Sequence, residues 1–331
     1  MALFNASLVG GSSVEIDGVT YDGDLKIIST PMEVKLANLP VTQTIDNRTV
    51  TAFEYKGYLY TASSTHLYKF YQNKWVEETA LPYTNTMSGF FEYDDKLYMI
   101  GSLLREGQGK GYVYDGETWT DIGLNMGGYS ANFNSRGKIL NLNGTLYMLG
   151  HVVENTMYNR MFSLQSDGTW KYLRDLPSIV GYSDGWASAT VHNGIMYLGG
   201  QTNNDIYTSS GGAWTKVTTA PKPTFNLVSH KDKLYVYGGT KYSTVDNGSY
   251  DYKDYSQCQT VYSFDGTTWT QENNVEHPLY YSVVINHKDK IYALGCNNVY
   301  YDTSYSGYKV QFVHEKQFVQ LNGNMIEVIT E

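Results

Sequence analysis

The segment GYVYDGETWT at residues 111–120 reads as a strand, a tight turn and a second strand. Close variants are VYSFDGTTWT at 261–270 and MFSLQSDGTW at 161–170. Looser copies occur at 206–215 and 67–76, and residues 308–319 keep the shape without the tryptophan. Five of the six tryptophans occupy this one position, which predicts that they pack between repeats. Recurrence every 40–50 residues or so indicates a repeat architecture.

A second motif, a tight turn followed by a short apolar strand, precedes each copy. Its six forms lie at residues 56–60, 95–101, 143–150, 193–200, 232–239 and 289–295. An apolar run comes before each turn, so every unit contains four short β-rich runs separated by turn residues. Runs this short suit strands that pack face to face better than helices.

These repeats resemble kelch repeats, which form β-propellers. The shared features are four strands per unit, a Gly-Gly pair after the second strand, an aromatic-Asp-Gly turn and a tryptophan at a fixed offset. The Gly-Gly pair is kept at Gly199-Gly200 and Gly238-Gly239 and altered in the other units. The resemblance implies an all-β fold, a six-bladed kelch-type β-propeller, with seven blades as the alternative.

The expected domains are an N-terminal β-rich segment at 1–47, the propeller at 48–321 and a C-terminal tail strand at 322–331. The N-terminal segment either attaches the chain to a partner or helps to close the ring, and we favour attachment. In a closed ring the last unit should pack on the first, because closure removes exposed sheet edges. The expected units span 48–86, 87–134, 135–185, 186–223, 224–279 and 280–321.

Composition narrows the classes of partner. The net charge is −9 and the arginines are few, which argues against a nucleic-acid-binding surface. Met1–Leu8 has no basic region and no apolar core, so the sequence predicts no signal peptide, and no run is long enough to cross a membrane. Cys258 and Cys296 are expected as two free thiols, with a single bridge as the alternative.

Loop lengths distinguish the two faces of the expected ring. The turns that join the first to the second strand, and the third to the fourth, are short, whereas the other connections are long and rich in tyrosine. Long loops on a rigid scaffold are where binding residues concentrate. We expect several of these tyrosines only to fold the loops on each other. The candidate binding residues are Tyr129, Tyr158, Tyr182, Trp186, Tyr242, Tyr252, Tyr301, Tyr305, Arg105 and Arg160.

The sequence shows no paired spacing of metal ligands, so we expect neither a metal nor a cofactor. The recurring His192, His230 and His287 are expected at the surface, beside short turns. Some kelch propellers are enzymes, and a sialic-acid mutarotase would need arginine against a carboxylate and a group for proton transfer. Arg105 and Arg160 fall in the long connections, but no catalytic set is evident, and we expect no enzyme.

The expected function is recognition or assembly without catalysis. By fold-level analogy, the short N-terminal β segment before a propeller suggests a bacteriophage virion component that binds a protein or a surface glycan. The alternatives are a carbohydrate-active kelch enzyme and an intracellular kelch adaptor for a protein partner. The expected location is the virion, or otherwise the cytoplasm.

Overall fold

The computed structural model describes side chains for residues 51–72, 74–85, 88–101, 109–129, 137–150, 159–178, 188–200, 203–224, 226–238, 259–272, 274–275, 279 and 283–294. It describes the backbone alone for residues 6–8, 13–16, 19–22, 24–35, 151–153, 156–158, 187, 243–246, 251–254, 295–302 and 309–329. The other residues are not described.

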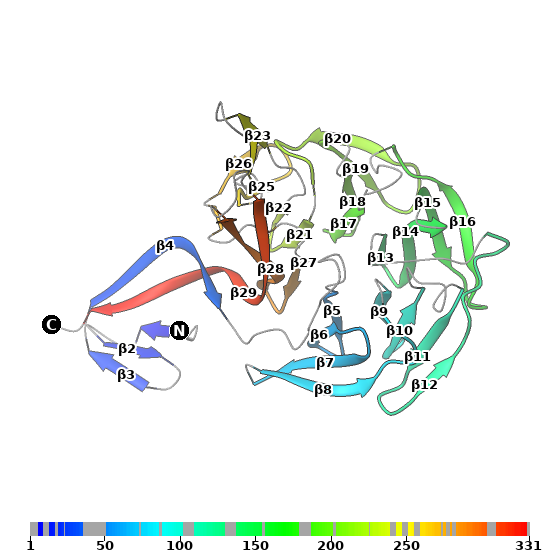
Figure 1. Ribbon diagram of the computed structural model, residues 1–331, viewed down its shortest axis with the longest axis horizontal. Helices are drawn as coiled ribbons and strands as arrows, with labels where there is room; N and C mark the ends of the chain where they lie inside the picture. Colours follow the sequence, from blue (N-terminus) through cyan, green and yellow to red (C-terminus); the bar gives the residue numbers. More distant parts are fainter. Residues whose placement is uncertain are drawn as a thin grey trace.

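Antiparallel four-stranded sheets stand around a central axis, with the first strand of each sheet nearest the centre (Figure 1). Five of them are blades built from continuous stretches of chain. Their strands are β5 (Phe53–Tyr55), β6 (Tyr58–Ala62), β7 (His66–Tyr71) and β8 (Lys74–Ala80) in blade 1; β9 (Gly89–Tyr93), β10 (Lys96–Ile100), β11 (Gly111–Tyr114) and β12 (Trp119–Asp121) in blade 2; β13 (Lys138–Leu142), β14 (Thr145–Val153), β15 (Thr156–Leu164) and β16 (Trp170–Asp175) in blade 3; β17 (Ala187–His192), β18 (Ile195–Gly200), β19 (Asp205–Ser209) and β20 (Thr215–Thr219) in blade 4; and β21 (Asn226–His230), β22 (Lys233–Tyr237), β25 (Tyr262–Phe264) and β26 (Trp269–Gln271) in blade 5.

The sixth four-stranded sheet is composite, and we call it the closing sheet. It contains β27 (Val283–His287), β28 (Lys290–Asp302), β29 (Lys309–Ile329) and, as its outer strand, β4 (Asp24–Lys35) from the N-terminal segment. The prediction of an all-β propeller is confirmed. Continuous blades number five in the described part of the chain, rather than the expected six, because the last sheet takes a strand from the opposite end of the chain.

The pairing between β4 and β29 carries two irregularities with a local cause. Val34 pairs with Gln320 and Ile28 with Met325, and the register shifts on both sides of the pair Met32–Gly323. Pro31 lies in this part of β4 and has no N–H to donate, so a regular ladder cannot pass through it. Figure 1 shows β4 and β29 running side by side away from the ring. The expected tail at 322–331 is not a separate strand: residues 322–329 are the end of β29, and residues 330–331 lie outside the described residues.

The remaining strands form two small sheets. A three-stranded sheet near the N-terminus contains β1 (Ala6–Leu8), β2 (Ser13–Ile16) and β3 (Val19–Asp22). A separate hairpin, β23 (Ser243–Asp246) paired with β24 (Asp251–Asp254), belongs to the connection between β22 and β25 of blade 5. Strands therefore occupy parts of the connections that the sequence assigned to long loops. In blade 3, for example, the connection between the second and third strands is a hairpin extension in which Val153 pairs with Thr156. Its β-branched residues favour strand over loop.

The first hairpin of each four-stranded sheet encloses only two residues. In blade 1, Tyr55 pairs with Tyr58, so Lys56 and Gly57 form the turn, both with positive φ of 48° and 70°. This is the turn whose twist matches that of antiparallel strands. The predicted tight turns on this face are confirmed, and we call it the short-turn face.

The aspartates of the Asp-Gly turns bind the backbone of their own turns. Asp115 Oδ1 accepts from the N–H groups of Glu117 and Thr118, both at 2.9 Å. Asp265 makes the same bonds to Thr267 and Thr268 at 2.8 Å, and these bonds lower its pKa to about 2. Hydrogen bonds to the charged form explain that direction.

The repeat tryptophans pack between neighbouring blades, which confirms their predicted role. Trp170 of blade 3 is 3% exposed and meets Phe91 of blade 2 edge-on at 6.2 Å. Trp269 of blade 5 donates from Nε1 to Thr218 Oγ1 of blade 4 at 3.1 Å. Each ring fills the space between two sheets, where burying its large apolar surface stabilises the boundary.

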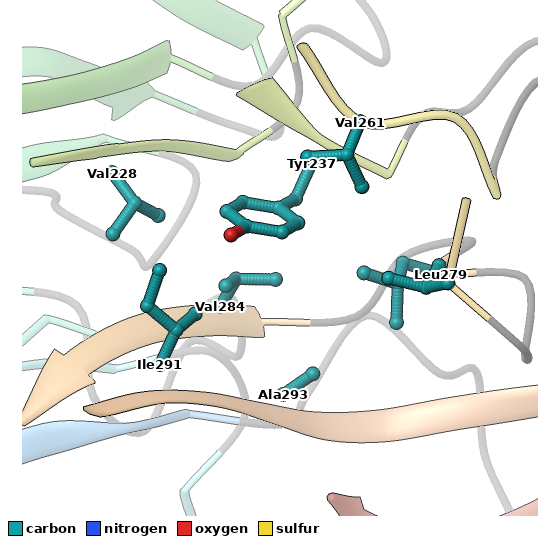
Figure 2. Close-up of a cluster of buried hydrophobic side chains, with 8 residues drawn as sticks. Val228, Tyr237, Val261, Leu279, Val284, Ile291 and Ala293 are labelled. Carbon is teal, nitrogen blue, oxygen red and sulfur yellow. The ribbon is translucent and has the colours of Figure 1, made fainter. Parts of the chain in front are cut away.

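Apolar cores also fill the boundaries between the sheets. Figure 2 shows Tyr237 of blade 5 facing Val284 and Ile291 of the closing sheet. Gly238 follows Tyr237 with a positive φ of 69°, and a Cβ there would collide with the Leu279 carbonyl oxygen. Only glycine allows the two backbones to approach this closely. This explains the glycine that follows the second strand in this repeat.

The closing sheet packs on blade 1, as a closed ring requires. Tyr292 and Leu294 are buried against Leu59, with Trp75 and Phe70 packed beside them. His287 Nδ1 also lies 2.5 Å from Glu54 Oε1 of blade 1. The expected contact between the last and first units is confirmed.

The expected surface position of the three recurring histidines is wrong. His192, His230 and His287 are only 7–8% exposed. Each ends the innermost strand of its sheet and faces the next sheet around the ring. His192 Nδ1 is 2.9 Å from Ser229 Oγ of blade 5, for example. The neighbouring sheet therefore covers a position that looks like a surface turn in a single repeat.

Candidate functional site

A cluster of aromatic and charged side chains lies at the boundary between blades 2 and 3. It contains Tyr129, Arg160, Phe162, Tyr172 and Asp175, and we call it the Tyr129–Arg160 cluster. The sequence singled out Tyr129 and Arg160 separately, and the structure brings them together. The Arg160 guanidinium lies over the Tyr129 ring, 4.9 Å from its centroid. A planar guanidinium on an aromatic face combines cation–π attraction with stacking.

Tyr129 is held in place by the segment that leads from blade 2 to blade 3. The side-chain Oδ1 of Asn125 accepts a hydrogen bond from the Gly127 N–H at 3.0 Å. The backbone carbonyl oxygen of Asn125 accepts one from the Trp170 N–H at 2.8 Å. Its Nδ2 donates to Thr169 Oγ1 at 3.1 Å. These bonds fix the segment on blade 3, and the positive φ of Gly127 and Gly128, 60° and 92°, lets the chain turn there.

The other members come from the two outer strands of blade 3. Residues 160 and 162 lie on the same face of β15 because side chains alternate along a strand. Phe162 pairs with Tyr172 of β16, and Arg160 pairs with Asp175 at the end of that strand. The Tyr129 ring meets the rings of Phe162 and Tyr172, with both centroids 5.4 Å away. Phe162 is completely buried and anchors the others.

Charge of both signs surrounds the Tyr172 hydroxyl. It donates to Asp175 Oδ1 at 3.2 Å. Desolvation and then this bond raise the pKa of Tyr172, and the nearby Arg160 partly offsets the rise. The hydroxyl therefore stays protonated at neutral pH and remains a donor. The cluster presents a cation, a carboxylate, a phenol and apolar ring faces, a combination that suits a ligand with polar groups on an apolar frame.

Asp175 ends β16 far from the turn that begins that strand, so the cluster faces away from the short turns. That the face with the longer connections carries the binding residues stays a prediction. Tyr172 and Asp175 were not identified from sequence. They reach the cluster through the register of β16 on β15, and residue spacing in the sequence does not give that register.

The remaining candidates cannot be joined to this cluster. Tyr158, Tyr252 and Tyr301 lie on β15, β24 and β28, with only their backbones described. Tyr182, Trp186, Tyr242, Tyr305 and Arg105 lie outside the described residues, as do Cys258 and the side chain of Cys296.

Within the described part of the chain, no group of three or more His, Cys, Asp and Glu residues could hold a metal ion. The same residues contain no helix long and apolar enough to cross a bilayer.

The ring of radial sheets defines the chain as a β-propeller, and the comparison with solved structures agrees. A structure titled "Structure of YjhT" is 14% identical, with a TM-score of 0.63, and the match covers 88% of this chain and 99% of that one. Identity this low shows a shared fold alone. No family model matches the chain, and neither does any curated protein.

Proposed function

We propose that this kelch-type propeller is a non-catalytic recognition module that binds a protein or a glycan through the Tyr129–Arg160 cluster. The stacking of Arg160 on Tyr129, beside the Tyr172–Asp175 hydrogen bond, carries the proposal. Aromatic rings and arginine are enriched at the energetic centres of binding surfaces. The non-catalytic part rests on the sequence, where no catalytic set is evident.

A glycan array tests the proposal. Wild-type protein is compared with Arg160→Ala and with Lys171→Ala, a control at an exposed position on β16 of the same blade. Loss of a central arginine typically costs about 2 kcal/mol, or roughly thirtyfold in affinity. We expect that loss for Arg160→Ala alone, with both variants melting near the wild-type temperature. Equal glycan binding by all three proteins would contradict the assignment of the cluster.

A finer proposal is that the chain is a phage virion component. Its support is the order of the chain, in which the small β1–β3 sheet precedes the ring, and the analogy is at the level of fold. Mass spectrometry of particles purified from the source is the test. Detection of the chain at a fixed stoichiometry would support this location, and its absence from particles would refute it.

A second candidate is a carbohydrate-active enzyme of the mutarotase kind. The observation that favours it is that Arg160 pairs with Asp175 across two neighbouring strands. The arginine could bind a substrate carboxylate, and the neighbouring acid could transfer protons. NMR of sialic-acid anomers distinguishes the two functions. Faster anomer exchange that disappears in both Arg160→Ala and Asp175→Asn would replace the recognition module with the enzyme.

A further inference from the structure

A second cation–aromatic cluster lies on the opposite, short-turn face, where the closing sheet meets blade 1. We define the lysine patch as Tyr58, Lys69, Tyr71 and Lys288. The Lys69 ammonium lies 4.0 Å from the Tyr58 ring centroid, and the Lys288 ammonium lies 5.4 Å from the same centroid. Two positive charges therefore share one tyrosine ring.

The patch is built by the strand register of blade 1 and the closure of the ring. Tyr58 follows the first turn of the blade, and Lys69 and Tyr71 are alternate residues of β7, whose side chains share one face. Lys288 comes from the first turn of the closing sheet. The Tyr71 ring meets the Tyr58 ring edge-on at 6.1 Å, and Lys69 lies 5.8 Å from its centroid. The patch is complete only when the ring is closed.

The structure describes no acid that neutralises either lysine. Among the described residues, Lys69 and Lys288 make no ion pair with a carboxylate, whereas Lys216 pairs with Asp205 at 2.6 Å. Glu54 of blade 1 is bound to His287 across the seam, and Asp289, which follows Lys288, has no described ion pair with either lysine. Lys74 is exposed and pairs with Tyr71 across the hairpin, which adds positive charge at the edge. A local excess of positive charge on a chain of net charge −9 marks a place for an acidic ligand.

The exposure of the patch favours a protein segment over a small anion. Tyr71 is 45% exposed and Lys288 is also exposed, so the surface is open. Lysine ammonium groups attract as point charges and do not fix a small anion as a bidentate arginine does. A nucleic acid would bring a dense negative charge against an acidic chain. An extended acidic peptide can place successive carboxylates near Lys69, Lys288 and Lys74 while its apolar atoms rest on Tyr71.

We infer that the lysine patch is a docking surface for an acidic segment of a partner protein. Because the Tyr129–Arg160 cluster faces away from the short turns, the two surfaces can be occupied together. The propeller can then connect two partners, which goes beyond recognition at a single site. This inference does not require the proposed function of the Tyr129–Arg160 cluster to be correct.

The test uses a fluorescein-labelled hexaglutamate peptide and fluorescence anisotropy. We expect the wild type to bind it more weakly as salt rises, since screening reduces exposed electrostatic attraction. The double variant Lys69→Gln/Lys288→Gln should bind roughly tenfold more weakly or worse. The matched control Lys110→Gln/Lys171→Gln removes the same charge from exposed positions elsewhere and should bind like the wild type. Lys69→Arg keeps the cation over the ring and should retain binding.

Three outcomes would overturn the inference. One is equal loss in the patch variant and the control variant, which would mean that only net charge matters. Another is equal binding of a hexaglutamine peptide. The third is complete competition by inorganic phosphate at millimolar concentration, which would identify a small-anion site. Arg160→Ala should leave hexaglutamate binding unchanged, so failure at either surface is distinguishable from failure at the other.

Discussion

Two boundaries between neighbouring sheets differ in how they are packed. One is the boundary between blades 2 and 3, and the other is the seam between the closing sheet and blade 1. Among the described residues, eight buried apolar residues form the core of the blade 2–3 boundary, including Phe91, Met148 and Trp170. The core of the seam has three, Leu59, Tyr292 and Leu294. The chain also runs directly from blade 2 to blade 3, whereas the seam joins segments far apart in sequence.

The difference shows where the ring needs extra interactions. At the seam, the His287–Glu54 bond adds a polar contact, and β4 covers an edge of β29 that would otherwise be exposed. The blade 2–3 boundary has its larger core, a direct connection and the bonds of Asn125 to blade 3 instead. Each boundary also carries one cation–aromatic cluster, one on each face of the ring.

Removing β4 should have the largest effect. Deletion of residues 1–35 exposes one edge of β29 and leaves the closing sheet with three strands. We expect the melting temperature to fall by more than about 10 °C, or the protein to aggregate through the open edge. Deletion of residues 1–22, which removes only β1–β3, should change the melting temperature little. Equal melting of the two truncated proteins would show that β4 does not support the ring.

Trp170→Ala should have the next largest effect, because it empties a buried space in the larger core. We expect a loss of about 3–5 kcal/mol in the free energy of unfolding. Trp75→Ala, at the same repeat position on the smaller seam core, should cost less. Urea denaturation measures both. A larger loss for Trp75→Ala would reverse our ranking of the two boundaries.

Stability should also fall in mild acid because of two buried histidines. Burial lowers the pKa of His192 and His230 below the usual 6.5, with Lys231 adding to the shift at His230 and with Asp232 and Asp289 opposing it. As the pH falls, the unfolded chain takes up these protons first, so this contribution is complete above about pH 6.5 and is lost below it.

Thermal melting between pH 8 and pH 5 checks this dependence. The double variant His192→Gln/His230→Gln should show a flatter pH profile than the wild type. The control His66→Gln changes a histidine on β7 that is 36% exposed and should keep the wild-type profile. If all three profiles have the same slope, the two buried histidines do not cause the acid sensitivity.

The smallest effect is expected from the polar contact at the seam. Glu54→Gln replaces the carboxylate that binds His287, and the 47% exposure of Glu54 limits the loss to about 1 kcal/mol. Glu117→Gln, in an exposed turn of blade 2, should change stability by less. Urea denaturation of Glu54→Gln, His287→Gln and the double variant Glu54→Gln/His287→Gln gives the coupling between the two residues. A coupling of zero would remove this contact from the account of closure.

The repeats themselves were predictable from sequence. The tryptophan position, the two-residue turns and the Asp-Gly turns are local patterns, and each one recurs in the structure as expected. The closing strand was not predictable in the same way. Lys35 pairs with Val319 near the other end of the chain, and no local periodicity records a partner at that distance.

The candidate site shows the same limit. Tyr129 and Arg160 were identified because the connections that carry them are long and polar. Tyr172 and Asp175 were missed because they occupy an ordinary outer strand, and only the register of β15 with β16 brings them to Arg160. The burial of His230 was missed for a related reason, since the covering residues belong to the next sheet.

A designed disulfide between β4 and β29 tests the closing sheet most directly. Val34 and Gln320 are paired in the ladder, at a separation that suits a disulfide. In a background with Cys258→Ser and Cys296→Ser, Val34→Cys/Gln320→Cys should oxidise to an intramolecular bond, seen by non-reducing electrophoresis, and should melt at a higher temperature when oxidised. The control Val34→Cys/Val319→Cys is offset by one residue and should oxidise poorly. Absence of the bond in the first protein, or equal oxidation of both, would contradict closure of the ring by β4.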